Sequence, residues 1–406
     1  MHEQFLNFIL ALVIIIVIAK LGGYVSTRLR QPSVLGELVA GLILGPTVVD
    51  MLHAWPVFAG DEHLAESIKF MAELGVILLM LLAGLELDLS DLVRSGKVSA
   101  VAGTLGVVVP LGLGYGIAVL FDAPPEEAIL VGLALSATSV SISAQTLMEL
   151  GVLRSQVGLA LLGAAVFDDI LVILLLSIAF VLLGGTGGGG VEILLTIGRM
   201  ILYLALAVAA GLYVLPWLIR RIERLPISQG AVAFVLVACL LFAWAAELLG
   251  GMAAITGAFL VGLFIGRTPY REIVEHGISV MAYGFFVPIF FINIGLEVNM
   301  REIGTGTGVV YALVLTVAAI LGKIMGCGLG ARLAGFATRP SLQLGIGMVS
   351  RGEVGLIVAS TALATGQLSA TGFSAVIFMV MAATLVTPPL LRASFAGDPA
   401  VGGEAK

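Results

Sequence analysis

Apolar residues fill this chain in long blocks, and short polar segments separate the blocks from one end to the other. A helix needs about 20 mostly apolar residues to cross the hydrocarbon core of a bilayer. Counting blocks of this kind predicts thirteen spans, the ninth of them short. They lie near residues 5–24, 33–52, 66–87, 98–120, 127–148, 155–183, 192–219, 229–249, 252–266, 277–297, 307–333, 342–364 and 371–391. The pattern predicts an all-α polytopic membrane protein.

The composition agrees with this prediction and excludes other classes. Only 11% of the residues are charged, while 60% are hydrophobic, and a soluble domain has about 25% charged residues. So few basic residues argue against a nucleic-acid partner, and apolar blocks at both ends exclude a single-span anchor. Cys239 and Cys327 both lie in apolar blocks, so neither a disulfide framework nor a thiolate metal site is expected.

The basic residues outside the spans predict the orientation of the chain. Cytoplasmic loops carry an excess of Lys and Arg, and alternate loops should therefore be basic. Arg301 alone falls on one side of the predicted membrane. On the other side lie Arg28, Arg30, Arg94, Lys97, Arg154, Arg220, Arg221, Arg224, Arg267, Arg271, Arg332, Arg339, Arg392 and Lys406. The N-terminus is expected outside and the C-terminus in the cytoplasm.

The second half of the chain repeats motifs of the first half in the same order. Residues 36–47 resemble 257–268, residues 84–88 resemble 295–299, and the stretch from Phe121 resembles the stretch from Phe336. Matched motifs are seven spans apart, and an odd offset turns the second copy upside down in the membrane. Inverted repeats of this kind are typical of secondary transporters, whose substrate sites lie near the midplane.

The repeats give the expected domain boundaries. Residues 1–183 form a first six-helix repeat, and residues 184–226 form a Gly-rich loop with a linker helix. Residues 227–393 form the second six-helix repeat, and residues 394–406 are a short cytoplasmic tail.

Ten charged residues fall inside the predicted spans, where each costs about 2.5–3.5 kcal/mol at the bilayer centre on insertion scales. They are Lys20, Glu37, Lys69, Glu73, Asp168, Asp169, Arg199, Lys323, Arg351 and Glu353. Lys20, Lys69 and Arg199 lie near span ends, where long side chains can reach the interface. Glu37 suits a structural role as well as a functional one.

Asp168 and Asp169 stand at the centre of a long apolar run. Two adjacent carboxylates cannot both stay ionised in a dry helix bundle without a partner. Neighbours on a helix point about 100° apart, so one can face a water-filled cavity while the other meets a buried cation. Lys323 and Arg351 are the candidates for that cation. The default interpretation is a proton- or cation-binding site. An intramembrane aspartyl protease needs carboxylates from two different helices, so no enzyme activity is expected.

Two polar segments interrupt the fifth and twelfth spans at matching points of the repeats. ATSVSIS at 137–143 is rich in hydroxyls, and VSRGEVG at 349–355 carries Arg, Gly and Glu. Broken helices expose backbone carbonyls and helix ends that bind small cations. Carbonyl, hydroxyl and carboxylate oxygens suit a hard cation such as Na⁺.

These residues resemble a known family. QPSVLGELVAGLILGP, GLELD, LSATSVSI, AAVFDDILVILLL, AILGKIMG and MVSRGEVGLIVA together resemble the monovalent cation/proton antiporter superfamily. The sequence is most similar to the NapA-type sodium/proton antiporters, in the branch that also holds the Kef potassium-efflux systems. Kef systems have a cytoplasmic nucleotide-binding domain, whereas only about fifteen residues follow the last span here, so gating by such a domain is not expected unless a separate subunit supplies it.

The resemblance implies an NhaA/NapA-like antiporter fold with two domains. Spans 4–6 and 11–13 would form a mobile ion-binding core, and the remaining spans a dimerisation domain. Asp169 would bind the Na⁺ and the proton, and Asp168 would pair with Lys323. Thr138 and Ser139 would lie where the two broken helices cross.

Further implications concern charge and assembly. Arg351 and Glu353 match an ion pair of the core. Asp at 168 with Lys at 323 resembles the electrogenic members. A homodimer in the bacterial inner membrane and an elevator-like movement are also expected, and no cofactor is expected.

The sequence therefore predicts exchange of intracellular Na⁺, or Li⁺, for external protons across the lipid bilayer. A K⁺/H⁺ antiporter or K⁺-efflux subunit is the alternative transporter, and a cation channel is the alternative class. His276, at the cytoplasmic edge of the tenth span, is a candidate pH sensor, but a solvated loop histidine is the preferred interpretation.

Overall fold

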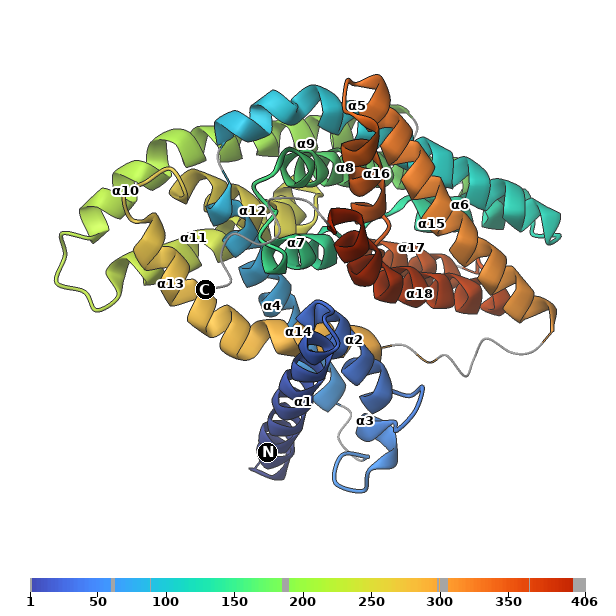
Figure 1. Ribbon diagram of the computed structural model, residues 1–406, viewed down its shortest axis with the longest axis horizontal. Coiled ribbons are helices and arrows are strands. Elements are labelled where there is room, and N and C mark those ends of the chain that lie inside the picture. Colours follow the sequence, from blue (N-terminus) through green and yellow to red (C-terminus); the bar gives the residue numbers. More distant parts are fainter. Residues whose placement is uncertain are drawn as a thin grey trace. The chain divides into compact units, whose positions relative to one another are not determined.

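A computed structural model describes residues 2–59, 63–87, 89–184, 190–297, 299, 306–364 and 366–396. All regular structure in this part of the chain is helical, and it contains no strand (Figure 1). The α-helices are α1 (His2–Arg28), α2 (Ser33–Leu44), α3 (Met51–Ala54), α4 (Leu64–Glu86), α5 (Leu89–Leu120), α6 (Pro125–Ser136), α7 (Val140–Glu149), α8 (Gln156–Gly184), α9 (Gly190–Ala209), α10 (Leu215–Ile222), α11 (Gly230–Ala245), α12 (Ala254–Ile265), α13 (Arg271–Met281), α14 (Val287–Leu296), α15 (Thr307–Leu333), α16 (Thr338–Gly347), α17 (Glu353–Ala364) and α18 (Ala370–Phe395).

Ten stretches of helix among the described residues are long and apolar enough to cross a membrane. Three of the thirteen predicted spans are not among them. Two of these correspond to the short apolar helices α2 and α12, each of 12 residues. The third, near 342–364, corresponds to α16 and α17, which the segment 348–352 separates.

The chain divides into two compact units. Unit 1 comprises residues 1–91 and 195–297, and unit 2 comprises residues 92–194 and 298–406. Each unit therefore draws on both halves of the sequence.

Unit 1 is built on two close helix pairs, α2 with α14 and α4 with α12. Glycines allow the close approach of these backbones. A Cβ atom on Gly41 would overlap the carbonyl of Ile292, and one on Gly84 would overlap the carbonyl of Phe259. Small residues at helix contacts are typical of membrane bundles, where close packing replaces the hydrophobic driving force. The GELVAGLILG and GAFLVGLFIG motifs supply α2 and α12, and the GLE motifs end α4 and α14.

Three π-helical segments widen the helices of unit 1: η1 (Ala210–Val214), η2 (Ala246–Gly250) and η3 (Ala282–Phe286). Pro216 follows η1 and Pro288 follows η3, each as the second residue of the next helix. A proline ring clashes with the carbonyl four residues earlier, and those residues, Leu212 and Gly284, lie inside the π segments. The wider turn accommodates the proline without ending the span.

In unit 2 two helical stretches are broken at mid-length. The backbone leaves the α-helix between α6 and α7, where Ala137 and Ser139 are extended. It leaves the helix again at 348–352, between α16 and α17. Helix α8 packs against α6, α7 and α16, and α15 packs against α16 and α18. The interruptions are therefore enclosed by long helices.

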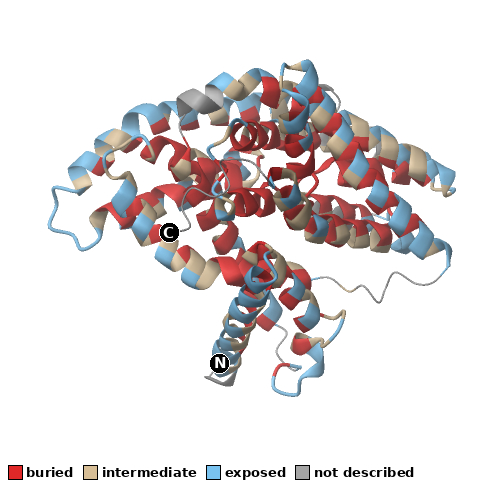
Figure 2. Cartoon of the chain, viewed as in Figure 1, coloured by how far each residue is buried: buried red, intermediate tan, exposed pale blue. Residues whose placement is uncertain are grey.

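Burial differs strongly between helices. In the stretch Pro125–Glu149, 94% of the most apolar window is buried, whereas in Gln4–Arg28 only 17% is. Figure 2 shows this contrast as mainly red residues on α7 and mainly pale blue residues on α1. The broken stretch α6–α7 is thus an interior element, and α1 has an apolar surface suited to lipid.

The three basic residues near span ends each meet an oxygen. Lys20 Nζ donates to the carbonyl of Tyr283 at 2.8 Å. Arg199 donates to the carbonyls of Leu248 and Leu249. Lys69 Nζ lies 3.7 Å from Glu297 Oε1. These side chains are exposed, so their charges have structural partners at accessible positions.

Candidate ion-binding site

The buried carboxylate of Asp168 contacts a buried ammonium group in unit 2. Helix α8 carries Asp168 and α15 carries Lys323, and Lys323 Nζ donates to Asp168 Oδ1 at 2.8 Å. Both side chains are 0% exposed. Two charges taken out of water are tolerated only when each finds its counter-charge. Of the two candidate cations, the structure therefore brings Lys323 to Asp168.

Only one oxygen of Asp168 is used in this contact. The other, Oδ2, has no hydrogen-bond partner among the described residues. Arg351 is also near enough to interact electrostatically with Asp168. Gly106 of α5 also lies near Lys323, and a Cβ there would be 3.8 Å from Lys323 Nζ. The pair is therefore enclosed by α5, α8 and α15.

The two helix interruptions cross each other, and backbone and serine groups join them. The amide of Ser139 donates to the carbonyl of Ser350 at 3.0 Å. The Ser350 hydroxyl donates back to the carbonyl of Ser139. Ser143 Oγ lies 2.8 Å from Ser350 Oγ and also donates to the carbonyl of Gly347. Polar groups freed by the broken helices are thus paired with each other, as burial in a membrane requires.

Arg351 holds the end of α16. Its Nη1 donates to the carbonyls of Met348, Val349 and Ser350 at 3.0–3.3 Å, and its Nη2 donates to the carbonyl of Ala319 at 3.1 Å. Carbonyls at a helix C-terminus carry partial negative charge, which a guanidinium neutralises. Arg351 is therefore the cap that makes this interruption tolerable in the interior.

Thr138 and Asp169 are two further buried residues of unit 2 with side-chain oxygens. Asp169 is 7% exposed and Thr138 is 5% exposed. Thr138 Oγ1 has no hydrogen-bond partner among the described residues. Ala137, next to Thr138, packs in one cluster with Val172, which lies one turn beyond Asp168 on α8. Helix α8, which carries both carboxylates, therefore packs near the interruption that carries the Thr138 hydroxyl, and oxygens of these kinds suit a hard cation.

Sequence reasoning missed several groups that hold this site together. Thr384 of α18 donates its hydroxyl to the carbonyl of Arg351, and Ala319 contributes only a carbonyl. No sequence pattern marks either residue. Ser143 and Ser350 lie within the two polar motifs, so the sequence could have indicated that they belong to the site. The expected partner of Arg351, Glu353, begins α17, and its side chain lies outside the described part of the structure.

Gly352→Ala should loosen the crossing, because a Cβ at Gly352 would lie 2.7 Å from both Cβ and Oγ of Ser139. Overpacking of this kind costs about 1–3 kcal/mol. We expect a lower thermal midpoint for the purified protein. Gly112→Ala in α5 is the matched control, since its Cβ would meet nothing within 4 Å. Equal midpoints for the two variants would contradict a tightly packed crossing.

Comparison with known proteins places the chain in a family. The family model described as "Sodium/hydrogen exchanger, transmembrane" matches residues 13–394. The chain belongs to the sodium/hydrogen exchanger family. Among its relatives is the Na(+)/H(+)-K(+) antiporter GerN of Bacillus cereus, 39% identical over 389 residues and covering 96% of each chain. The Na(+)/H(+) antiporter of Enterococcus hirae is 32% identical, over 95% of this chain and 98% of its own.

Solved structures support the fold of this exchanger-family chain. The sodium proton antiporter MjNhaP1 from Methanocaldococcus jannaschii matches with a TM-score of 0.69, covering 98% of this chain and 99% of its own. Its sequence identity is 19%, so the likeness concerns the arrangement of helices. An all-helical, multi-pass membrane architecture is common to both.

Proposed function

We propose that this chain is a secondary antiporter that exchanges intracellular Na⁺, or Li⁺, for external protons. The observation that carries the proposal is the buried Asp168–Lys323 pair, which lies beside Asp169 and the crossing of two broken helices. Ionisable groups inside a membrane bundle are costly and are typical of ion or proton pathways. The antiporter names of the family relatives support the same activity.

Asp169 is the proposed binding group for the cation and the proton. Thr138 and Ser139 are proposed to add oxygens from the first interruption. Protons and Na⁺ compete for one carboxylate, so binding of either displaces the other. This competition couples the two fluxes without a separate linking device. Asp168 and Lys323 are proposed to respond to the exchange, since Na⁺ at Asp169 adds a positive charge next to the pair.

The proposed transport movement is an elevator-like displacement of unit 2, which carries the site, relative to a dimerising unit 1. Unit 2 contains the helices of predicted spans 4–6 and 11–13, and unit 1 contains the others. This division supports the proposed core and dimerisation domains. A homodimer in the bacterial inner membrane, with the C-terminus in the cytoplasm, completes the proposal.

The proposed architecture has thirteen spans in two inverted six-helix repeats around a linker helix. Helices α2, α12 and the broken stretch α16–α17 would supply the three spans beyond the ten long ones. Two contacts support a pseudo-symmetric arrangement, because α2 packs on α14 just as α12, the counterpart of α2, packs on α4, the counterpart of α14. The crossing of α6–α7 with α16–α17 joins two segments that are counterparts of each other.

Proteoliposomes with an imposed pH gradient test this function. Adding Na⁺, Li⁺ or K⁺ in turn should dissipate the gradient with saturable kinetics for Na⁺ and Li⁺. A response to K⁺ alone would favour the alternative K⁺/H⁺ antiporter, which the printed name of GerN makes a specific candidate. Cation conduction without proton movement would instead identify a channel and overturn the proposal.

A further inference from the structure

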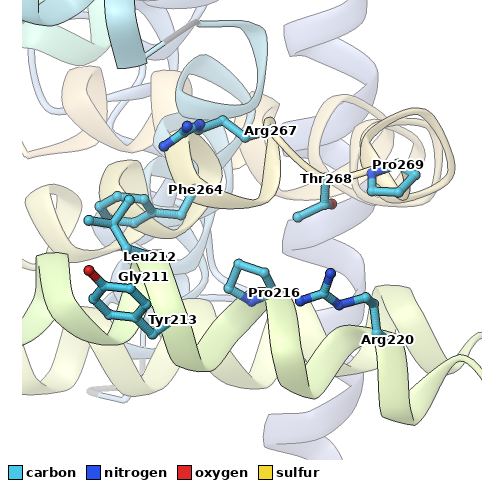
Figure 3. A pocket seen from close by; sticks show the side chains of 9 residues that line it. All are labelled: Gly211, Leu212, Tyr213, Pro216, Arg220, Phe264, Arg267, Thr268 and Pro269. Carbon is cyan, nitrogen blue, oxygen red and sulfur yellow. The ribbon is translucent and has the colours of Figure 1, made fainter.

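A cavity of about 340 Å³ lies in unit 1, far along the sequence from every residue of the candidate ion site. The junction of η1 and α10 forms one wall, and the end of α12 with the loop after it forms the other (Figure 3). Helix α12 packs against both η1 and α10. The cavity is therefore built by segments in direct contact within one unit.

The proline and the glycine of the η1–α10 wall shape this cavity. Pro216 follows the π segment, in which the amide of Leu215 donates to the carbonyl of Ala210. Gly211 lies against the ring of Phe264, with which any Cβ at this position would overlap. The η1–α10 wall can therefore approach α12 closely at Gly211. On the C-terminal side of Gly211, the wider π turn and Pro216 keep the two walls of the cavity apart.

Two guanidinium groups line the cavity. Arg220 projects from α10 and Arg267 from the end of α12, and Figure 3 shows Arg220 directed toward the segment that carries Thr268. Both arginines are exposed, and neither guanidinium group has a hydrogen bond or ion pair with a residue that the structure describes. Thr268 donates its hydroxyl hydrogen to the carbonyl of Ile265 at 2.7 Å. The positive charge of the cavity therefore comes from the two arginines and is available to a ligand.

Two further lining residues, Leu212 and Tyr213, expose apolar surface. Leu212 is 36% exposed and Tyr213 is 75% exposed. One turn from Tyr213 is Trp217, which is 49% exposed and carries the guanidinium of Arg221 4.5 Å from its ring centroid. Aromatic and basic residues together are typical of the interface between bilayer and water. The ligand of this cavity should accordingly have an anionic head and an apolar body.

We propose that this cavity binds the phosphate headgroup of an anionic phospholipid. Arginine is the side chain best suited to bind phosphate through paired hydrogen bonds. Arg220 and Arg267 would bind the headgroup, and an acyl chain would lie along Leu212 and Tyr213. Both arginines belong to the loops expected on the cytoplasmic side, where anionic lipid attracts basic residues. A free phosphate ion would use the guanidinium groups but leave the exposed apolar wall without a role.

The test measures lipid-dependent thermal stability of the full-length protein in detergent. Phosphatidylglycerol, phosphatidylcholine and inorganic phosphate are titrated separately, and the apparent affinity is read from the shift of the thermal midpoint. We expect stabilisation by phosphatidylglycerol at concentrations where the other two have no effect. Each arginine near an anionic surface contributes a factor of about 5 in affinity, so Arg220→Gln with Arg267→Gln should weaken binding about 30-fold.

Arg221→Gln is the matched control, because Arg221 is adjacent to Arg220 on α10 but stacks on Trp217 outside the cavity lining. It should bind phosphatidylglycerol within about twofold of the unmodified protein. The unbound midpoint of the double variant should agree with that of the unmodified protein, since the guanidinium groups of Arg220 and Arg267 have no described partner. An equal loss in Arg221→Gln would indicate general surface charge and overturn the site. Equal stabilisation by inorganic phosphate, or by phosphatidylcholine, would overturn the anionic lipid as its ligand. None of these readouts depends on which cation the protein exchanges.

Discussion

Asp169→Asn should reduce proton-coupled Na⁺ flux in proteoliposomes to the level of protein-free vesicles. The amide has nearly the same shape as the carboxylate, so the buried position on α8 can keep its packing. An amide carries no charge and does not release a proton at the pH of the assay. The variant therefore loses both the negative charge that attracts Na⁺ and the proton that Na⁺ displaces.

Asp169→Glu and Glu149→Gln make this experiment specific. Glutamate retains a carboxylate, so Asp169→Glu should keep measurable exchange with altered affinity. Glu149 is an exposed carboxylate of the same unit, at the end of α7, and accepts a hydrogen bond from Gln145 at 2.9 Å. Its replacement by Gln should leave exchange unchanged. Saturable Na⁺-dependent proton movement by Asp169→Asn would refute Asp169 as the binding group.

Lys323→Ala should strongly lower the thermal midpoint of the purified protein. Removing one partner of a buried ion pair leaves the other charge unpaired, at a cost of about 3–5 kcal/mol. The Asp168 carboxylate is 0% exposed, and one of its oxygens already lacks a hydrogen bond among the described residues. Transport should also change its dependence on membrane voltage, since a positive charge is lost beside the site.

A double-mutant cycle separates the pair from the packing around it. Asp168→Asn with Lys323→Met removes both charges, and replacing a whole buried pair by neutral groups is often tolerated. The double variant should thus be more stable than Lys323→Met alone, and the coupling free energy between the two sites should fall within the range of about 0.5–3 kcal/mol that residues in contact show. Purely additive effects on the midpoint would contradict an energetically significant pair.

The sequence was most informative about the site where a charged residue lies in the middle of an apolar block. Every apolar block of sufficient length predicts a helix, and an ionised residue in the middle of such a block needs a partner. This reasoning reduced the partners of the central carboxylates to Lys323 and Arg351. Choosing between them requires the geometry, in which Lys323 bonds to Asp168 while Arg351 bonds to four carbonyls.

The rest of the site depends on backbone carbonyl groups, and their positions cannot be predicted from the type of residue that carries them. The carbonyl of Ala319 receives a hydrogen bond from Arg351, and any residue could supply it. Thr384 lies far along the chain from the residue whose carbonyl it contacts. The π segments were also not predicted. A proline inside a span signals some irregularity, but its form depends on how the neighbouring helices pack.

The number of long helices illustrates a similar limit. Helices α2 and α12 are only 12 residues long, although the apolar blocks around them extend further. Helix α2 ends at Leu44, and the next residue, Gly45, has an extended backbone that packs against Gly295. Hydropathy reports the length of an apolar block, whereas the helix boundary depends on a close contact with another element.

The paired charges of unit 2 limit the stoichiometry of exchange. In the proposed cycle Na⁺ and a single proton each add one positive charge when they bind at Asp169, so a one-for-one exchange would move no net charge across the membrane. Electrogenic exchange therefore requires a second group that releases a proton as Na⁺ binds. Lys323 is in contact with Asp168 and holds a proton that such a cycle could use. The number of protons moved per cation would then depend on whether this one hydrogen bond breaks during each turnover.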